Sequence, residues 1–547
     1  MNKKDIILVT ILFLVALWLW TLPIKNNPLP FGEGDAAWHF ANGDWAAQSD
    51  HSFWRSPPYI AYWYYGYNTI LGEAALEYPP PWHLNEGIMQ IIGGERFVPV
   101  FIYIAITCFL FIFSTYFLIR KLYGALPAFL VGFGLIFSLR NIMVYLWGQR
   151  PTTASFAFIP IILYSFYKYF NSHMEGKERP IYLYITVLLM AGQYMFHLMG
   201  LIITVPVVLI FAIFLSIKNR KFPVTKSNLK TILICSFIFL ILTMPFILIY
   251  LGGGGQAPTS IKIQKISSLF HWFRHEKADV ANVYPAARFP YSQLYGNHLL
   301  PFLFLGIIFL LIRRKDKDIL LLSWLVGMYL VLHLDVLSIG DTGRISRLLV
   351  AESYLFYSII VIGLVNLISL IKLPSQKKNY IKYALVVLFL ISVTSIQGKQ
   401  AYSTLNNAYQ GILRITPYQY EYAEWIDKNL PKDALVHTVG PITYPKMRFI
   451  HVLSHRFLID QSRYSSFHNH SLVKEKNLTI DYLLIDYSDL IQLQNQERFG
   501  KYLNYTLEWE KSLQPNLTLI YEGKYHRIYK IKDNYLSNPG DFPFQFL

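Results

Sequence analysis

Two acidic residues near the start of the chain stand where acid–base chemistry could occur. Glu33 and Asp35 flank Gly34, and glycine adopts backbone conformations that other residues resist. If a helix begins here, Asp35, Trp38 and His39 share one face, because residues at i, i+3 and i+4 are neighbours. Asp35 is then either a simple helix N-cap or a carboxylate held ready to accept a proton.

A second chemically suggestive segment reads Glu77-Tyr78-Pro79-Pro80-Pro81-Trp82-His83. Its three prolines favour an extended, rigid backbone that could present Glu77 and His83 to a ligand. The alternative is a stiff connector. Seven Trp and Tyr residues between positions 54 and 67 precede it. Such residues either line a membrane interface or stack on sugar rings.

Cationic side chains occur at the ends of several apolar runs. Arg150, His197, Arg344 and Arg347 are candidates for binding an anion, and the arginine fork suits phosphate oxygens. Glu352, His333 and Asp335 fall at the same ends of their runs. Ionisable groups beside membrane segments are costly and therefore suggest function. For each residue alone, the alternative is a side chain that reaches the interface with its charged tip or one whose hydrogen bonds are simply satisfied.

The composition indicates the class of protein in which these ionisable residues are placed. The 547 residues are 54% hydrophobic and 15% charged, with a mean hydropathy of +0.34. So apolar a chain excludes disorder, and two cysteines exclude a disulfide scaffold. The net charge of +16 does not indicate nucleic acid, because the basic clusters lie in short gaps between apolar runs. A polytopic membrane protein remains.

The apolar runs predict a polytopic α-helical protein with about eleven transmembrane helices, since about 20 apolar residues cross a bilayer. The predicted crossings are 6–24, 97–119, 125–139, 153–170, 181–196, 198–217, 231–251, 299–312, 319–337, 348–371 and 383–396. Residues 140–150 are expected to form a short outer loop.

Alternate connections between these crossings are rich in Lys and Arg. They lie at 120–121, 177–179, 218–230, 313–317 and 372–382. The positive-inside rule places them, and the N-terminus, in the cytoplasm. With eleven crossings the C-terminal part is then extracytoplasmic. We expect an integral protein of the plasma membrane.

The predicted domains are a transmembrane domain, 1–396, and an extracytoplasmic α/β domain, 397–547. The first contains two large outer loops, 25–96 and 252–298. In the second, a helix is expected at 418–429 and strands at 434–439, 481–486 and 518–531. Four Asn-x-Ser/Thr sequons, at Asn469, Asn477, Asn504 and Asn516, are either glycosylation sites in an outward-facing tail or chance matches.

Taken together, these features resemble the GT-C superfamily of membrane glycosyltransferases, of the oligosaccharyltransferase-like archaeal or bacterial type. The resemblance rests on Glu33-Gly34-Asp35 just after the first helix and on the Tyr78-Pro79-Pro80 segment. It also rests on the tail, where residues 422–436 look like the opening of the soluble domain and 527–531 like its last strand. The chain departs from oligosaccharyltransferases at 437–444, which holds no Trp-Trp-Asp-Tyr-Gly motif.

The resemblance implies transfer of a sugar from a polyprenyl-phosphate or polyprenyl-diphosphate donor, with inversion, to a glycan, protein or lipid acceptor on the outer membrane face. Asp35 is the expected base and Glu33 its alternative. Arg344 and Arg347 are expected to bind phosphate, with Arg150 and His197 as further candidates. His39, Glu77 and His83 would contact donor or acceptor.

The sequence also allows predictions about metals, partners and alternative functions. A divalent metal, Mg or Mn, lacks support, because residues 140–150 hold no acidic pair. Membrane lipids are expected partners, and nucleic acid is not. Two other functions stay open: a transporter or flippase of a lipid-linked or sugar substrate, and a non-catalytic membrane assembly protein. The absence of an evident repeat and the position of the polar groups favour the enzyme.

Overall fold

The computed structural model describes residues 3–33, 35–48, 55–59, 74–75, 80–252, 291–332, 348–370, 375–440, 444–460 and 480–532. Glu77, Arg344 and Arg347 lie outside these ranges. Contacts divide the chain into two compact units. The helical unit comprises residues 1–22, 77–82 and 102–406. The loop–tail unit comprises 23–76, 83–101 and 407–547. Most of the first predicted outer loop is thus grouped with the tail.

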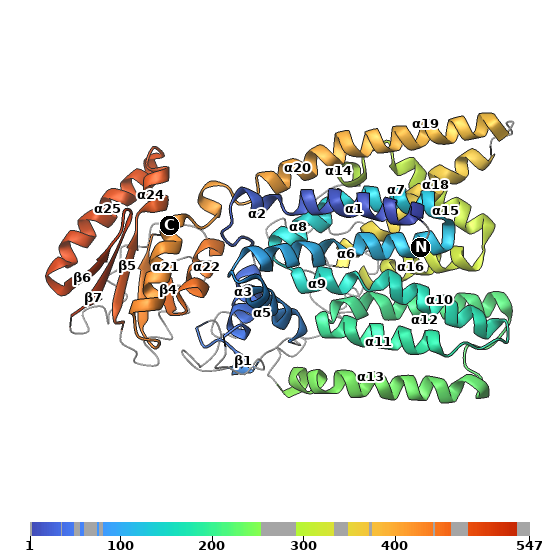
Figure 1. The fold of residues 1–547 in the computed structure, drawn as a ribbon, viewed down its shortest axis with the longest axis horizontal. Helices are drawn as coiled ribbons and strands as arrows, with labels where there is room; N and C mark the ends of the chain where they lie inside the picture. Colours follow the sequence, from blue (N-terminus) through green and yellow to red (C-terminus); the bar gives the residue numbers. More distant parts are fainter. Residues whose placement is uncertain are drawn as a thin grey trace, which may run out of the picture. The chain divides into compact units, whose positions relative to one another are not determined.

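The helical unit consists of helices, several of them lying side by side, as α10 to α13 do in Figure 1. Their bounds are α1 Lys3–Trp20, α6 Val98–Tyr123, α7 Ala125–Ile136, α8 Leu139–Trp147, α9 Arg150–Phe156, α10 Ile159–Met174, α11 Ile181–Phe196, α12 Met199–Asn219, α13 Lys226–Gly252, α14 Tyr291–Tyr295, α15 Leu300–Arg313, α16 Asp316–Leu332, α18 Glu352–Leu370, α19 Ser375–Val393 and α20 Lys399–Asn406. A 3₁₀ turn, Leu349–Ala351, precedes α18, and a π turn, Thr394–Gly398, joins α19 to α20.

Within the described residues, five helices are long and apolar enough to cross a membrane, and six if the bent pair α7–α8 counts as one span. All eleven predicted crossings overlap helices, but several of these are short: α11 has 16 residues and α15 has 14. The protein is therefore mostly helical with several candidate spans, and the number eleven stays a prediction.

Two predicted boundaries are wrong. Residues 140–147, expected in an outer loop, form α8, which is bent by 45° from α7. The predicted crossing 153–170 is interrupted between α9 and α10, where Pro160 in the first turn of α10 lacks the N–H that would continue the hydrogen-bond ladder.

The predicted cytoplasmic connections contact one another at one end of the helical unit. Asp5 of α1 pairs with Arg120 at the end of α6, at 2.8 Å. Further contacts join Tyr123 to Asp318, Lys218 to Asp316 and Lys221 to the Met174 carbonyl. Four of the five basic connections thus gather together, as a common side of the membrane requires.

Short helices and a mixed sheet form the loop–tail unit. The helices are α2 Leu22–Asn26, α3 Ala36–Ala46, α5 Pro81–Gly93, α21 Pro417–Asn429, α22 Tyr444–Ser454, α24 Ser488–Leu493 and α25 Glu497–Leu513, and 3₁₀ turns lie at Gly411–Leu413 and Gln514–Asn516. The strands are β1 Arg55–Ser56, β2 Ala74–Ala75, β3 Leu435–Val439, β4 Phe457–Asp460, β5 Tyr482–Asp486, β6 Leu517–Glu522 and β7 His526–Ile531. Pro81 and Trp82 of α5 belong to the helical unit.

Among the described residues, the tail sheet has the order β4-β3-β5-β7-β6, with β3 parallel to β4 and β5 and the β5–β7–β6 ladder antiparallel. Helices α24 and α25 lie on one face and α21 and α22 on the other (Figure 1). Successive side chains along a strand point to opposite faces of the sheet. Leu483 and Ile485 join the core under α25, whereas Asp486 accepts hydrogen bonds from Gln419 and Tyr422 of α21.

Local signals in the tail match the structure closely. The helix expected at 418–429 is α21, and Thr416 and Gln419 cap its start reciprocally. The strands expected at 434–439 and 481–486 are β3 and β5. The strand pattern expected at 518–531 forms the hairpin β6–β7, in which residues 523–525 turn the chain back.

We expect Gly440→Ala to destabilise the tail sheet. Gly440 follows β3 with φ +125°, and a Cβ atom there would overlap the Asp486 carbonyl oxygen. Gly411→Ala is the matched control, since its φ is +65° but the nearest atom to its added Cβ lies 3.7 Å away. The control should cost roughly 1 kcal/mol, and Gly440→Ala clearly more. Thermal unfolding of the purified chain checks this, and equal losses would contradict it.

Candidate functional site

The candidate site begins at α3, which carries the predicted acid at its start. Asp35 precedes the helix, is half-buried, and accepts the backbone N–H of His39 through its carbonyl at 3.0 Å. Its carboxylate makes no capping hydrogen bond to the first turn of α3. Asp35 thus takes the N-cap position without using its side chain as a cap. Glu33, also half-buried, accepts the Ala36 N–H through its carbonyl.

Two of the predicted histidines meet between α3 and α5. His39 Nδ1 lies 3.0 Å from His83 Nε2, with the rings stacked at 22°. The edge of Trp38 contacts both rings, and the two histidines are almost completely buried. Burial lowers the pKa of His83 to about 3. His83 is therefore neutral at ordinary pH. A hydrogen bond joins the two rings, with one ring nitrogen donating its N–H to the other.

Glycines let α3 and α5 approach closely enough for this pair to form. A Cβ atom on Gly43 would lie 2.5 Å from the Cβ of Glu86, and one on Gly87 would lie 2.9 Å from the Gly43 carbonyl oxygen. Both contacts are shorter than real side chains allow. The two glycines therefore fix the spacing of the helices, with Glu86 fully buried at their contact.

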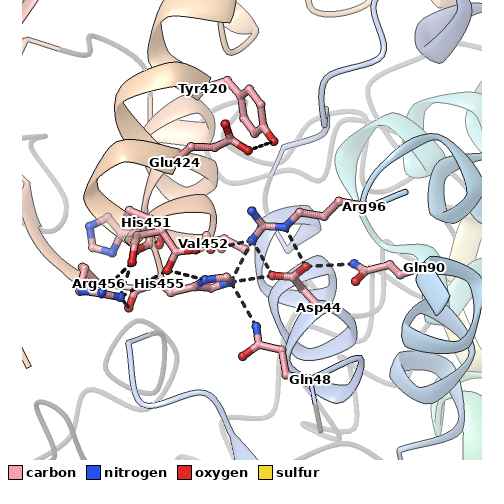
Figure 2. A network of polar contacts seen from close by, with 12 residues as sticks. Asp44, Gln48, Gln90, Arg96, Tyr420, Glu424, His451, Val452, His455 and Arg456 are labelled. Carbon is pink, nitrogen blue, oxygen red and sulfur yellow. Dashed lines mark hydrogen bonds and ion pairs between the residues drawn. The ribbon is translucent and has the colours of Figure 1, made fainter. Parts of the chain in front are cut away.

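The other end of α3 is held by the buried carboxylate of Asp44 (Figure 2). Arg96 grips it bidentately, with Nε 2.8 Å from Oδ1 and Nη2 2.6 Å from Oδ2. Gln90 donates to Oδ1 at 3.1 Å, and His455 Nε2 lies 2.8 Å from Oδ2. A bidentate arginine and two further donors satisfy a carboxylate that is only 4% exposed.

His455 carries the network into the tail. Its Nδ1 lies 3.0 Å from Asp427 Oδ1 of α21, so both ring nitrogens face carboxylates. His455 adopts φ +47° just after α22, a left-handed conformation that costs a non-glycine residue roughly 1 kcal/mol or more. The two carboxylate contacts hold it there. The network Asp44–Arg96–His455–Asp427 thereby ties α3 to the tail helices within one unit.

The opposite charges in this network stabilise one another, although the Arg96 charge acts to lower the pKa of His455. Burial alone would raise the pKa of Asp44, but the Arg96 charge and the hydrogen bonds from His455 and Arg96 lower it below its usual range. Burial would lower the pKa of His455, but hydrogen bonds to Asp427 and Asp44 raise it. The His455 contact also holds the pKa of Asp427 down against burial. The network is most stable with ionised carboxylates and a protonated imidazole.

A separate polar cluster lies inside the helical unit. Arg140 of α8 pairs with Glu352 at the start of α18, at 2.8 Å and with both side chains buried. Tyr291 donates to the same Glu352 oxygen at 2.8 Å and stacks on the Arg140 guanidinium. The sequence singled out Glu352 but not Arg140. Arg140 follows the end of an apolar run, and this position was the feature of the sequence that could have identified it.

The remaining predicted residues are dispersed. Arg150 is fully buried as the first residue of α9, and His197 ends α11, where its Nδ1 accepts the Met199 N–H. Both lie in the helical unit, whereas Glu33, Asp35, His39 and His83 lie in the loop–tail unit. In the part of the chain that is described, no three His, Cys, Asp or Glu side chains gather as a metal site.

Comparisons with known proteins identify the fold. No protein-family model matches the sequence, and no curated protein matches it. Solved structures do match. An oligosaccharyltransferase from Archaeoglobus fulgidus aligns over 90% of this chain and 70% of its own, at 14% identity and a TM-score of 0.57. ArnT from Cupriavidus metallidurans, bound to undecaprenyl phosphate, aligns over 95% and 97%, at 12% identity and a TM-score of 0.54.

The mycobacterial arabinofuranosyltransferase AftD aligns over 96% of this chain but 41% of its own, at 12% identity and a TM-score of 0.53. These neighbours are GT-C glycosyltransferases. The chain therefore shares its fold with these proteins, as the sequence resemblance to the GT-C superfamily predicts.

We expect Asp44→Asn to destabilise the loop–tail unit by roughly 3 kcal/mol, the scale of breaking a buried ion pair by removing one partner. Arg96 and His455 would keep their positions but lose the shared carboxylate. Glu497→Gln, which removes an exposed partner of Lys501, is the control and should cost less than about 1 kcal/mol. Hydrogen exchange of α3 and α22 measures both, and similar protection in the two variants would contradict the expectation.

The stabilising effect of His455 should depend on pH. Because its folded pKa is raised, its contribution is full below the ordinary value of about 6.5 and is lost as pH rises through the raised value. The melting-temperature difference between wild type and His455→Gln should therefore shrink as pH rises from about 5 to about 9. The lowered pKa values of Asp44 and Asp427 set the opposite limit, with stability lost at strongly acidic pH. A difference that grew with pH would refute this assignment.

Proposed function

We propose that this protein is a membrane glycosyltransferase that moves a sugar from a polyprenyl-phosphate or polyprenyl-diphosphate carrier to an acceptor. The observation that carries the proposal is the alignment over nearly the full length of this chain and of ArnT, together with Asp35 at the start of α3. The fold alone does not determine the chemistry, which we infer from the site.

In the proposed reaction, Asp35 takes the proton from the acceptor hydroxyl as its oxygen attacks the anomeric carbon. The bond from that carbon to the carrier phosphate breaks, and the phosphate leaves with the electron pair. A single in-line displacement inverts the anomeric centre. Asp35 suits the role because it is a half-buried carboxylate at the start of α3. Glu33, two residues earlier, is the alternative base.

The departing phosphate needs cationic stabilisation. Arg344 and Arg347 remain our candidates for it, with Arg150 and His197 as further ones. Arg140 is a weaker candidate, because Glu352 already neutralises its charge. We assign His39 and His83 to contacts with donor or acceptor, and Glu77 is a further candidate for such contacts. The described residues contain no group of three or more His, Cys, Asp or Glu side chains that could hold a metal.

The proposal includes the arrangement in the membrane. The N-terminus would be cytoplasmic, the spans about eleven, and the domain 397–547 extracytoplasmic, because the basic connections gather at one end of the helical unit. The acceptor would be a glycan, protein or lipid on the outer face. Neighbouring structures contain dolichol phosphate, undecaprenyl phosphate and an acceptor peptide, which supports a polyprenyl-phosphate donor in general.

We expect Asp35→Asn to lower sugar transfer about 100- to 10,000-fold, the usual contribution of a general base. The substitution keeps the size and hydrogen-bonding capacity of the side chain and removes its ability to accept the proton. Transfer of radiolabelled sugar from a panel of polyprenyl-phosphate donors to an envelope extract, with purified protein in lipid nanodiscs, measures it.

Glu33→Gln is the matched control and should retain most of the activity with an unchanged melting temperature. Undiminished transfer by Asp35→Asn together with loss in Glu33→Gln would move the base to Glu33. Wild-type protein that transfers no sugar from any donor in the panel would overturn the proposed function.

A further inference from the structure

Two arginines end helices of the helical unit in a left-handed backbone conformation. Arg220 follows α12 with φ +53°, and Arg314 follows α15 with φ +47°. Glycine, and less often asparagine, is the usual residue at such a helix end, because other side chains are strained there. Strain of this kind clusters at sites where the strained residue has a function. The two positions therefore hold a cationic side chain at the expense of an unstrained backbone.

The charges of these two arginines are not compensated by a carboxylate. Both side chains are exposed, and in the described part of the chain neither forms an ion pair. The nearby acid Asp316 is already bound by Lys218, at 2.6 Å. Arg314 donates from its Nε to the Leu311 carbonyl at 2.7 Å, which leaves its terminal nitrogens for another acceptor. The guanidinium fork suits phosphate oxygens in particular.

Two lysines hold the arginines at one place in the helical unit. Lys218 donates from its Nζ to the Arg314 carbonyl at 2.9 Å, so the end of α12 touches the turn between α15 and α16. Lys221 donates to the Met174 carbonyl at the end of α10. Arg220 thus lies between two anchored lysines, beside the turn that carries Arg314.

Exposed apolar side chains adjoin this pair of arginines. Ile217 lies three positions before Arg220 and Ile312 two positions before Arg314, and they are 70% and 76% exposed. Phe222, two positions after Arg220, is the most exposed large apolar side chain of the described residues, at 77%. Helix α12 is a candidate membrane span, so its end lies where acyl chains meet headgroups. A ligand that fits this surface has both an anionic group and an apolar chain.

We propose that Arg220 and Arg314 form a binding site for the phosphate of an anionic phospholipid, whose acyl chains lie along Ile217 and Ile312. Two guanidinium groups donate charge-assisted hydrogen bonds to the phosphate oxygens. Basic clusters at the membrane surface recognise anionic lipids in this way. A zwitterionic lipid fits less well, because its headgroup carries a cation of its own beside the phosphate. The site does not depend on the proposed sugar transfer.

The double variant Arg220→Asn with Arg314→Asn tests the site in the full chain. Asparagine tolerates the left-handed conformation, so the substitution removes the charge without adding strain. The matched control, Lys177→Gln with Arg179→Gln, removes two exposed cations from another basic connection. Native mass spectrometry of each purified protein in detergent counts bound phosphatidylglycerol and phosphatidylcholine, supplied at equal concentrations. The melting temperature of each protein is also measured without lipid.

We expect wild type to retain phosphatidylglycerol over phosphatidylcholine, and the asparagine variant to lose this preference by about fivefold for each arginine. Its melting temperature without lipid should equal that of wild type or exceed it. Unchanged lipid preference with a lower melting temperature would show that the arginines only cap their helices, and would overturn the proposal. An equal loss of preference in the control would show a diffuse effect of charge and would also overturn it, as would a wild type with no preference.

Discussion

The loop–tail unit depends on the ion pair and hydrogen bonds that the buried carboxylate of Asp44 accepts. An ionised carboxylate removed from water costs several kcal/mol, and here a bidentate arginine, a glutamine and a histidine replace the lost water. These donors come from α5, from Arg96 between α5 and α6, and from His455 just after α22. One charge therefore holds together segments that are far apart in the chain. It also anchors the end of α3 opposite to Asp35, so a rigid helix positions the candidate base.

Much of the fold could be predicted, because its signals are local. Apolar length located the helical segments, and the Thr416-Pro417 start and β-branched runs located α21, β3 and β5. The bend after α7 could not be predicted. Residues 140 and 141 are polar and look like a loop, but Glu352 and Tyr354 satisfy them. A polar segment becomes a buried helix only when such distant partners exist, and no pattern within the segment reveals them.

The candidate site shows the same limit. Residue type alone selected His39 and His83, and the structure brings them together at 3.0 Å across 44 positions. His455 gave no comparable signal. It lies 411 positions from Asp44 and in a tail rich in polar residues. The grouping of residues 23–76 and 83–101 with the tail is a consequence of such contacts, whereas a division by hydropathy assigns the whole loop to the membrane domain.

Helix α5 shows that the spacing of apolar residues alone would predict the wrong buried side of a helix. Read as a helix in water, Ile88, Ile91 and Ile92 should form the buried stripe, and His83 and Glu86 the solvated one. The structure has the reverse, because Gly43 and Gly87 admit only a close helix contact and the polar residues of α5 serve that contact. The polarity of α5 is thus set by its contact with α3.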